Sequence, residues 1–261
     1  MARVEAPLPR LLVVAGHDPS GAGIDADRGA LAGLPLDARF VVSAWTEQNA
    51  SGVQALGARG ARTWLAEACA ELPVAALKFG LLPGREDVRA AAELVRAARE
   101  RAHGSLWVVV DPVLASSSAG RFLDAEGARE YLRSLLPAGV ILTPNLDELA
   151  ELANADRGAL ARDLAAREAA ARTLLELGAA AIVAKGGHGD EDPACDLVLA
   201  READPVWLQH ARIRGGKVRG SGCRFATRLA ARLALGTSLV EAVSEASEHV
   251  LSRIREARQH T

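Results

Sequence analysis

The sequence is poor in aromatic residues and in sulfur. Its 261 residues include four Trp, four Phe, one Tyr and a single Met, so the core must be built from closely packed Ala, Leu, Val and Ile. The three cysteines, Cys69, Cys195 and Cys223, are too widely spaced for a disulfide framework or a C-x-x-C metal site. Neither sign of charge dominates, because 31 Lys and Arg face 33 Asp and Glu. A nucleic-acid partner held by a cationic face is therefore not expected.

Long apolar runs are also missing. None approaches the roughly 20 residues that a membrane-spanning helix needs, and no membrane partner is expected. The first residues bring an acid and a proline early and lack the apolar centre of a signal peptide. Disorder is excluded, because 49% of the residues are hydrophobic and 25% are charged. We therefore expect a cytoplasmic enzyme or small-molecule binder whose residues 1–261 form a single domain.

Short β-branched runs alternate along the chain with Ala-rich helical stretches. This alternation is typical of βαβ units and predicts an α/β fold, a three-layer αβα sandwich around a mostly parallel central sheet. The predicted strands are residues 11–15, 40–43, 75–78, 106–110, 140–142 and 181–185, with a later edge strand at 197–199. The predicted helices are residues 61–71, 86–102, 124–136, 146–152, 157–177, 224–235 and 239–257.

Polar or glycine-rich residues follow every major predicted strand. In open α/β sheets, ligands bind beyond the carboxyl ends of the strands. The sharpest local feature is the G-S-G-C run at 220–223, which leads into an Ala-rich helix. Backbone N–H groups at such a helix start bind anions, and a thiol placed there, Cys223, is expected to have a lowered pKa. A capped helix with a space-filling cysteine is the alternative interpretation.

Seven motifs, taken in order, resemble those of the hydroxymethylpyrimidine/phosphomethylpyrimidine kinases, ribokinase-fold enzymes of thiamine biosynthesis. The resemblance runs from about residue 11 to residue 255 and implies a ribokinase-like fold. The motifs are G-H-D-P-S-G-A-G-I-D-A-D (16–27), Q-N with G-V (48–53), K-F-G-L-L (78–82), D-P-V (111–113), T-P-N-L-D-E (143–148), K-G-G-H (185–188) and G-S-G-C (220–223).

The resemblance implies an activity. A kinase of this kind uses ATP and Mg²⁺ to phosphorylate the alcohol of 4-amino-5-hydroxymethyl-2-methylpyrimidine, and the resemblance leaves open whether its monophosphate is a second acceptor. It also implies a homodimer. Two alternatives stay open. One is a kinase of pyridoxal or a related hydroxymethyl heterocycle, and the other is a non-catalytic pyrimidine-binding or regulatory protein.

The resemblance also implies residue roles for phosphoryl transfer. The N–H groups of Gly220, Gly222 and Cys223 suit the charge on the transferred phosphoryl group. Cys223 either accepts the alcohol proton or positions the hydroxyl. The nucleotide contacts that the resemblance implies are Asn145, Lys185, Ser221 and Arg224, with Lys185 also counted as catalytic.

Metal and acceptor contacts complete the implied site. Asp111 and Glu148 would hold Mg²⁺, which favours a few carboxylates and several waters. A purely structural origin stays open for Glu148 as a helix-cap residue and for Asp27 as an early-helix acid. The implied pyrimidine contacts are Gly16, Asp27, Gln48, Leu81 and Val113, where the amide of Gln48 can pair with a ring nitrogen and an exocyclic amine.

The chain departs from the family pattern in three places. The family opens with G-[ST]-D-P-S-G-G-A-G-I-Q-A-D, whereas this chain has one glycine fewer, His17 for Ser or Thr, and Asp25 for Gln. After residue 113 the chain continues L-A-S-S-S-A-G, where the family has a K-S-G-D-like ending, so a lysine and an acid are missing. Arg224 replaces the usual Thr after the cysteine; its guanidinium suits a phosphate, and the alternative is a side chain that points to solvent from the first helical turn.

Overall fold

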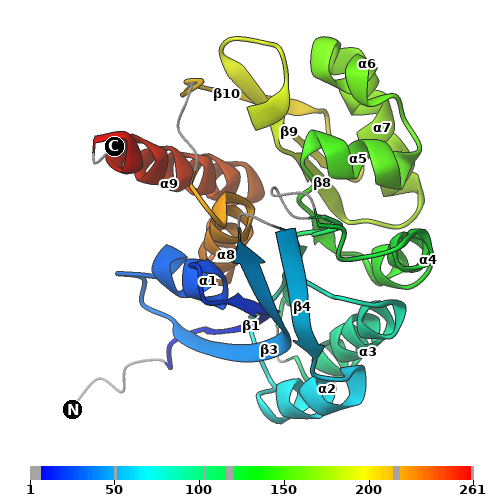
Figure 1. The fold of residues 1–261 in the computed structure, drawn as a ribbon, viewed down its shortest axis with the longest axis vertical. Coiled ribbons are helices and arrows are strands. Elements are labelled where there is room, and N and C mark those ends of the chain that lie inside the picture. Colours follow the sequence, from blue (N-terminus) through cyan, green and yellow to red (C-terminus); the bar gives the residue numbers. More distant parts are fainter. Residues whose placement is uncertain (1–6, 50–51, 103, 116–119, 214–217, 260–261) are drawn as a thin grey trace.

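The computed structural model describes residues 7–49, 52–102, 104–115, 120–213 and 218–259. They form one mixed sheet with helices on both faces (Figure 1), so the three-layer α/β prediction is confirmed. Within the described residues, no helix is both long and apolar enough to cross a membrane. The strands are β1 (Arg10–Asp18), β2 (Ala22–Gly23), β3 (Asp37–Asn49), β4 (Gly52–Ala58), β5 (Ala76–Phe79), β6 (Trp107–Val110), β7 (Ile141–Leu142), β8 (Ala181–Ala184), β9 (Ala194–Ala200) and β10 (Val206–His210).

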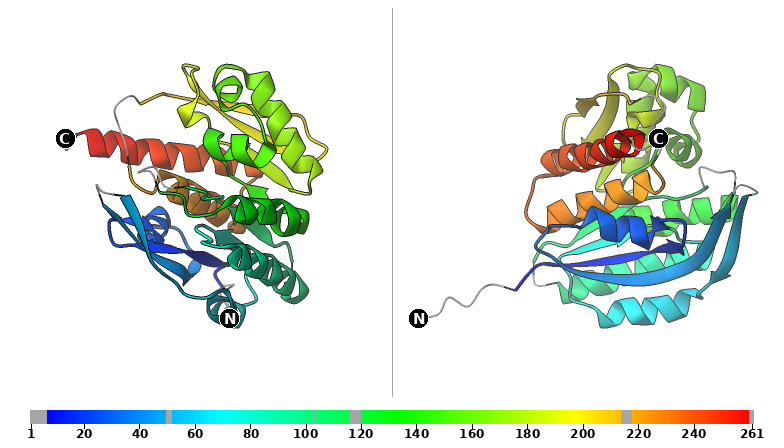
Figure 2. Two further views of the ribbon diagram at one scale, coloured as in Figure 1. Left: turned by 45° about the vertical axis from the view of Figure 1, so that its right-hand side comes forward. Right: turned by 60° about the vertical axis from the view of Figure 1, so that its left-hand side comes forward.

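The sheet is parallel at its centre and antiparallel at both edges. Its order is β10-β9-β8-β7-β6-β5-β1-β3-β4, with β2 paired to β1. Strands β3, β1, β5, β6, β7 and β8 run parallel to one another, whereas β4 pairs antiparallel with β3, β9 with β8, and β10 with β9. Because the central strands share one direction, their carboxyl ends lie along one edge of the sheet. Figure 2 shows β3 and β4 curving past that edge.

The two faces of the sheet are covered by separate sets of helices (Figures 1 and 2). Strand β1 shows why: Leu11 and Val13 pack against one set, and Leu12 and Val14 pack against the other. The first set is α1 (Ile24–Ala30), α8 (Ser221–Ala234) and α9 (Leu239–Gln259). The second set is α2 (Ala61–Ala70), α3 (Arg85–Arg101), α4 (Ala125–Glu130), α5 (Leu146–Ala153), α6 (Arg157–Arg162) and α7 (Leu164–Glu176).

Two predicted helices are interrupted. The helix predicted at 157–177 is divided into α6 and α7, because the Asp163 side chain accepts a hydrogen bond from the Ala165 N–H and starts a new helix. The helix predicted at 124–136 continues from α4 as a π-helical turn (Tyr131–Leu135) and a short 3₁₀ turn (Leu136–Ala138). The strand predicted at 197–199 is longer and is not an edge, since β10 pairs with β9 beyond it.

Candidate active site

Asp111 and Lys185 meet at the carboxyl ends of β6 and β8. Lys185 Nζ lies 2.9 Å from Asp111 Oδ1, and the Asp111 side chain is only 4% exposed. Burial opposes the charge of Lys185, but Asp111 and Glu148 outweigh it and raise the pKa of the ammonium group. The backbone N–H of Lys185 donates a hydrogen bond to the Pro144 carbonyl, which links the end of β8 to the loop that follows the neighbouring strand β7. A positively charged lysine therefore stands at the centre of the ligand-binding edge.

The glycine turn before α8 faces this ion pair. Gly220 has a left-handed φ of 69° and caps α8, a conformation that glycine adopts without strain. A Cβ placed on Gly222 would lie 3.2 Å from Asp111 Oδ2 and 3.4 Å from Lys185 Nζ. The N–H groups that begin α8 thus share one space with the lysine ammonium group, an arrangement that suits an anion such as a phosphate. The structure brings together Gly220, Gly222, Lys185 and Asp111 as the sequence predicted.

The Cys223 thiol is not activated in the way that the sequence suggested. Burial raises the pKa of this thiol to about 12; the charge of Lys78 works in the opposite direction, but Asp27 and Asp111 raise the pKa further. The expected lowering of the Cys223 pKa is therefore wrong, because desolvation outweighs the helix start. Near neutral pH the side chain is a thiol that can position a hydroxyl group. Cys223 remains half-buried and lies directly beside Gly222.

Asn145 and Glu148 form a capping box at the start of α5. Asn145 Oδ1 accepts from the N–H groups of Asp147 and Glu148, and Glu148 Oε2 accepts from the Asn145 N–H. The cap role that the sequence left open for Glu148 is thus present. Burial raises the pKa of Glu148 to about 8; the charge of Lys185 opposes this and that of Asp111 adds to it. A nearby cation such as the Lys185 ammonium group therefore favours the charged form of Glu148 against burial.

The residues expected to line the acceptor slot lie at the carboxyl end of β1 and next to it. A Cβ on Gly16 would lie 2.8 Å from the Leu81 side chain, so the two are in close contact. Gly23 has a φ of 60°, and a Cβ there would lie 2.0 Å from the Gly16 carbonyl oxygen, so only glycine lets β2 approach β1. Val113 is half-buried two residues beyond Asp111. The backbone of Gln48 belongs to β3, but its side chain lies outside the described residues.

A buried ion pair lies beneath the glycine turn. Lys78 Nζ is 2.9 Å from Asp27 Oδ1, and both side chains are 0% exposed. The same Asp27 oxygen accepts from Thr227 Oγ1 at 2.7 Å, and Thr227 lies one helical turn after Cys223. Asp27 therefore holds Lys78, and its contact with the acceptor remains a prediction. Lys78 lies in the K-F-G-L-L motif but was given no role from the sequence, although a charged residue within the otherwise apolar run A-L-K-F was a visible clue.

Arg224 contacts the neighbouring helix α1. Its Nη1 donates to the Ala26 carbonyl, and its guanidinium lies against Gly29 of α1. In this structure the Arg224 side chain therefore points across to α1, and its contact with a phosphate remains a prediction. Ser221, the first residue of α8, stays a predicted nucleotide contact. Residues 116–119, which carry another departure from the family pattern, lie outside the described residues.

The Asp196 carboxylate holds the loop that follows Lys185 in place through hydrogen bonds. One of its oxygens accepts from the Gly186 N–H at 2.7 Å, and the other lies 2.8 Å from Ser247 Oγ and 3.2 Å from His210 Nε2. Burial would raise the pKa of Asp196, but the hydrogen bonds from His210, Gly186 and Ser247 lower it. The bond to Asp196 raises the pKa of His210. One buried carboxylate therefore joins the loop after β8 to β10 and α9.

His210→Gln is expected to lower stability in acid more than in base. The pKa of His210 is raised in the folded protein. The ion pair with Asp196 therefore contributes fully to the free energy of unfolding below pH 6.5, the ordinary pKa of histidine. This contribution is lost as the pH rises through the raised pKa of the folded protein. Urea unfolding at pH 6 should show a loss of about 1–3 kcal/mol, with a smaller loss at pH 8.5. His188→Gln, which removes an exposed histidine, is the control. An equal loss at both pH values would contradict the ion pair.

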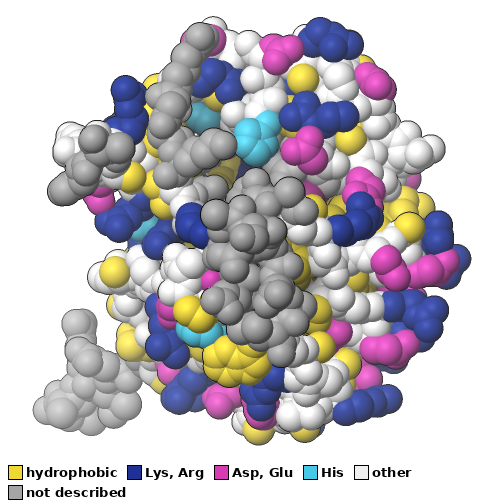
Figure 3. Space-filling view, in the orientation of Figure 1, with side chains coloured by type: hydrophobic (Ala, Val, Ile, Leu, Met, Phe, Trp, Pro, Cys, Tyr) yellow, Lys and Arg dark blue, Asp and Glu magenta, His cyan; other side chains and the backbone are white. Residues whose placement is uncertain are grey.

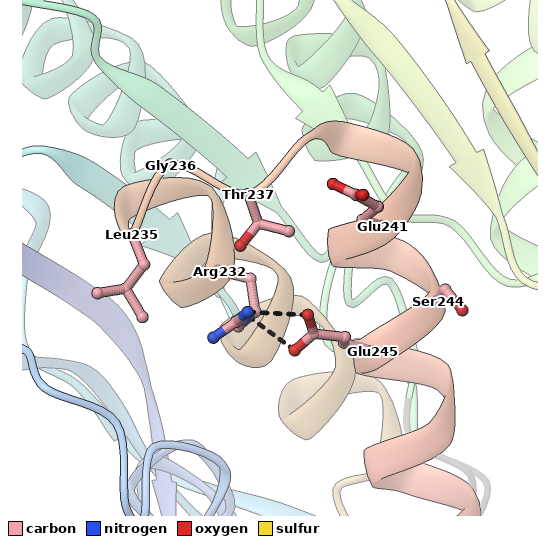
Figure 4. A pocket seen from close by; sticks show the side chains of 7 residues that line it. All are labelled: Arg232, Leu235, Gly236, Thr237, Glu241, Ser244 and Glu245. Atoms are coloured by element: carbon pink, nitrogen blue, oxygen red, sulfur yellow. Dashed lines mark hydrogen bonds and ion pairs between the residues drawn. The ribbon is translucent and has the colours of Figure 1, made fainter.

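A separate hollow lies at the turn between α8 and α9 (Figure 4). Arg232 and Glu245 face each other across it in an ion pair, and Thr237 and Glu241 lie above them. This turn is at the carboxyl end of α8, about 20 Å along the helix from Gly220. Its central charges neutralise each other, so the hollow is not the site of an anionic ligand. Over the face in Figure 3, basic and acidic side chains are likewise interspersed.

Fold and site together define a class of protein. A three-layer α/β sheet with a lysine, an acid and a glycine turn at its carboxyl edge is the arrangement of a ribokinase-like kinase. Sequence comparison agrees, since residues 18–261 match the family model described as phosphomethylpyrimidine kinase. The chain belongs to the phosphomethylpyrimidine kinase family.

Two curated relatives support this membership. The hydroxymethylpyrimidine/phosphomethylpyrimidine kinase of Rhizobium meliloti (strain 1021) is 34% identical over 250 residues, which cover 94% of this chain and 90% of the relative. The protein of the same name from Streptomyces coelicolor is 36% identical over 251 residues, covering 94% and 88%. The family resemblance predicted from the ordered motifs is therefore confirmed.

Solved structures share the fold. The phosphomethylpyrimidine kinase from Clostridium difficile 630 superposes with a TM-score of 0.77 at 25% identity, covering 94% of this chain and 99% of that one. An ADP complex of Bacillus subtilis pyridoxal kinase gives a TM-score of 0.79 at 27% identity, covering 92% and 90%. The ribokinase-like fold is thus confirmed, and both vitamin kinases are similar to this chain.

Proposed function

We propose that this protein transfers the γ-phosphoryl group of ATP to 4-amino-5-hydroxymethyl-2-methylpyrimidine, and then phosphorylates the resulting monophosphate. The observation that carries the proposal is the glycine turn before α8, where a Cβ added to Gly222 would lie 3.2 Å from Asp111 Oδ2 and 3.4 Å from Lys185 Nζ. Membership of the phosphomethylpyrimidine kinase family supports the choice of acceptor.

The residues of the site divide the work of phosphoryl transfer. Lys185 and the N–H groups of Gly220, Gly222 and Cys223 would neutralise the charge that develops on the transferred group. Cys223 would hold the acceptor hydroxyl in line with the phosphorus atom. The bond between the γ-phosphorus and the bridging oxygen breaks with its electron pair going to ADP, and as the new P–O bond forms the hydroxyl proton passes to an oxygen of the transferred phosphoryl group and then to water. Asn145 would lie beside the phosphates next to Lys185.

Mg²⁺ fits the two buried carboxylates. Among the described residues there is no cluster of three or more His, Cys, Asp or Glu side chains for a metal ion. Mg²⁺ needs fewer protein ligands, because it is bound by one or two carboxylates together with substrate phosphates and water. Asp111 and Glu148 would hold it, and the ion would neutralise charge on the phosphate oxygens. Both acids lie at the carboxyl ends of the central strands, Asp111 beside Lys185 and Glu148 in the capping box of α5, and this placement supports a cation there.

Three further expectations belong to the proposal. The described residues share one continuous sheet, which supports a single domain over residues 1–261. A homodimer and a place in the cytoplasm follow from the family resemblance. Sedimentation of the purified protein would test the first of these two directly.

Pyridoxal is the second candidate acceptor. The fold match with the Bacillus subtilis pyridoxal kinase, at a TM-score of 0.79, is as good as the match with the phosphomethylpyrimidine kinase structure. A cysteine in the turn is also compatible with such an activity. The two acceptors share a hydroxymethyl group on a planar heterocycle, so the choice between them depends on the ring contacts.

ADP release in the presence of Mg²⁺ tests the proposal. The purified protein is offered the pyrimidine alcohol, its monophosphate and pyridoxal in separate reactions. We expect turnover of the first two, with kcat/KM for the pyrimidine alcohol well above that for pyridoxal. Turnover of pyridoxal alone would contradict the proposal, and binding of the pyrimidine without turnover of any acceptor would identify a non-catalytic binding protein.

A further inference from the structure

Two departures from the family pattern lie next to each other in space, beside an exposed tryptophan. His17 replaces a Ser or Thr and Asp25 replaces a Gln of the opening motif. His17 is the Cα partner of Trp45 in the β1–β3 pairing, and the two ring centroids are 5.0 Å apart at an interplanar angle of 81°. Asp25 Oδ2 lies 4.0 Å from His17 Nδ1. We call these three side chains the rim.

The rim has binding capacity that the protein does not use. Trp45 is 44% exposed, one of three large hydrophobic side chains exposed in the described part of the chain. The Asp25 side chain is 45% exposed, and 4.0 Å exceeds a direct hydrogen bond to His17. Neither the imidazole nor the carboxylate has a hydrogen-bond partner among the described residues. An indole face and two polar groups are therefore open to a ligand.

The rim borders the slot expected to hold the acceptor ring. His17 directly follows Gly16, which contacts the Leu81 side chain. The His17 carbonyl accepts a hydrogen bond of 3.4 Å from Thr46 Oγ1, which fixes the strand position next to Trp45. Gly23 packs on the Gly16 carbonyl and leads into the first turn of α1, where Asp25 lies. The backbone thus places His17 next to the Gly16–Leu81 contact, and Trp45 and Asp25 lie beside His17.

We propose that the rim determines acceptor specificity: Trp45 stacks on the heteroaromatic ring, and Asp25, next to His17, favours a ring that carries an amine donor over a ring that carries an anionic oxygen. The inference rests on the proposed function. An aminopyrimidine offers an exocyclic N–H group to a carboxylate, whereas the ring hydroxyl of pyridoxal ionises easily and would face a like charge. Stacking on an exposed aromatic side chain is tolerant of ring type and adds affinity for either heterocycle.

Restoring the family's residues tests the role of Asp25. The variants D25Q and H17S carry the residues of the family motif. We expect D25Q to raise the ratio of kcat/KM for pyridoxal to kcat/KM for the pyrimidine by about tenfold, with KM for ATP unchanged, and H17S to raise it less. D204Q, which removes an exposed acid at the β9–β10 turn, is the matched control and should leave the ratio unchanged. An unchanged ratio in D25Q would overturn the proposal.

Trp45 is tested by kinetics and by direct binding. W45A should raise KM for the pyrimidine about tenfold and leave KM for ATP unchanged, whereas L177A, which removes another exposed hydrophobic side chain, should change neither. Binding of the pyrimidine should quench tryptophan fluorescence in the wild-type protein, and the quenching should disappear in W45F. Of the other tryptophans, Trp64 is fully buried, Trp107 begins β6 at the opposite edge of the sheet, and Trp207 lies in β10 at the far end of the strand order. If the pyrimidine is turned over normally and neither the rise in KM in W45A nor the loss of quenching in W45F is seen, the specificity role of the rim is wrong, whereas the proposed function stands. Absence of turnover would instead count against the proposed function, and the quenching experiment would still decide whether Trp45 stacks.

Discussion

Lys78→Met is expected to lower the free energy of unfolding by about 3–5 kcal/mol. The substitution leaves the Asp27 carboxylate without its ammonium partner in a place where both side chains are 0% exposed. Burial of the lone carboxylate is costly, and burial already raises the pKa of Asp27 against the opposing charge of Lys78. Urea unfolding of the wild-type protein and the variant at neutral pH measures the difference.

The double variant Asp27→Leu with Lys78→Met separates charge from packing. Replacement of both partners of a buried ion pair by hydrophobic residues is often neutral or stabilising, so most of the lost stability should return. Catalytic activity should not return, because both side chains lie beneath the turn that begins α8. Thr227→Val, which removes only the hydroxyl bonded to Asp27, is the milder control. A fully stable single variant Lys78→Met would contradict the buried ion pair.

Cys223→Ala is expected to reduce kcat by about 100-fold or more while the folding stability changes little. The side chain is half-buried at a helix start, so its removal leaves no large internal cavity. A misplaced hydroxyl is enough to cost about 100-fold in rate, even without a change in general base. Initial rates with saturating ATP and acceptor, together with urea unfolding, give the two quantities.

Cys223→Ser distinguishes the two roles that the sequence left open. With a pKa of about 12, the thiol is protonated near neutral pH, and we therefore expect it to position the hydroxyl. A serine hydroxyl can make the same kind of hydrogen bond, so the serine variant should retain more activity than the alanine variant. If Cys223 were instead a thiolate base, kcat would rise tenfold per pH unit between pH 7 and pH 9 and both variants would be equally inactive.

The sequence predicted those strands and helices whose pattern of apolar residues matches their burial in the structure. The central strands are buried on both faces and appear as continuous apolar runs, which is why β1, β5, β6 and β8 were predicted near their true bounds. Helix α1 was missed, because Gly23 provides no side-chain cap to mark its start. The helix break at Asp163 was missed, because the residues on both sides of it have high helix propensity.

The candidate site divides in the same way. The glycine turn and the acids after the strands were predictable, because parallel strands bring their carboxyl ends to one edge. The partners of the buried charges were not predictable, because they are distant in the sequence. Lys78 and Asp27 are 51 residues apart, and Asp196 and Ser247 are also 51 residues apart. The orientation of Arg224 toward α1 depends on how two helices pack, and no local pattern encodes it.

Phosphorus NMR of a single reaction tests the central claim most directly. The purified protein is mixed with ATP, Mg²⁺ and the pyrimidine alcohol, and the spectrum is followed as ATP is consumed. The account predicts a phosphate monoester signal that couples to methylene protons and grows in step with ADP. ATP that is hydrolysed to ADP and inorganic phosphate without this signal, or ATP that stays unchanged while pyridoxal is phosphorylated in a parallel tube, would contradict it.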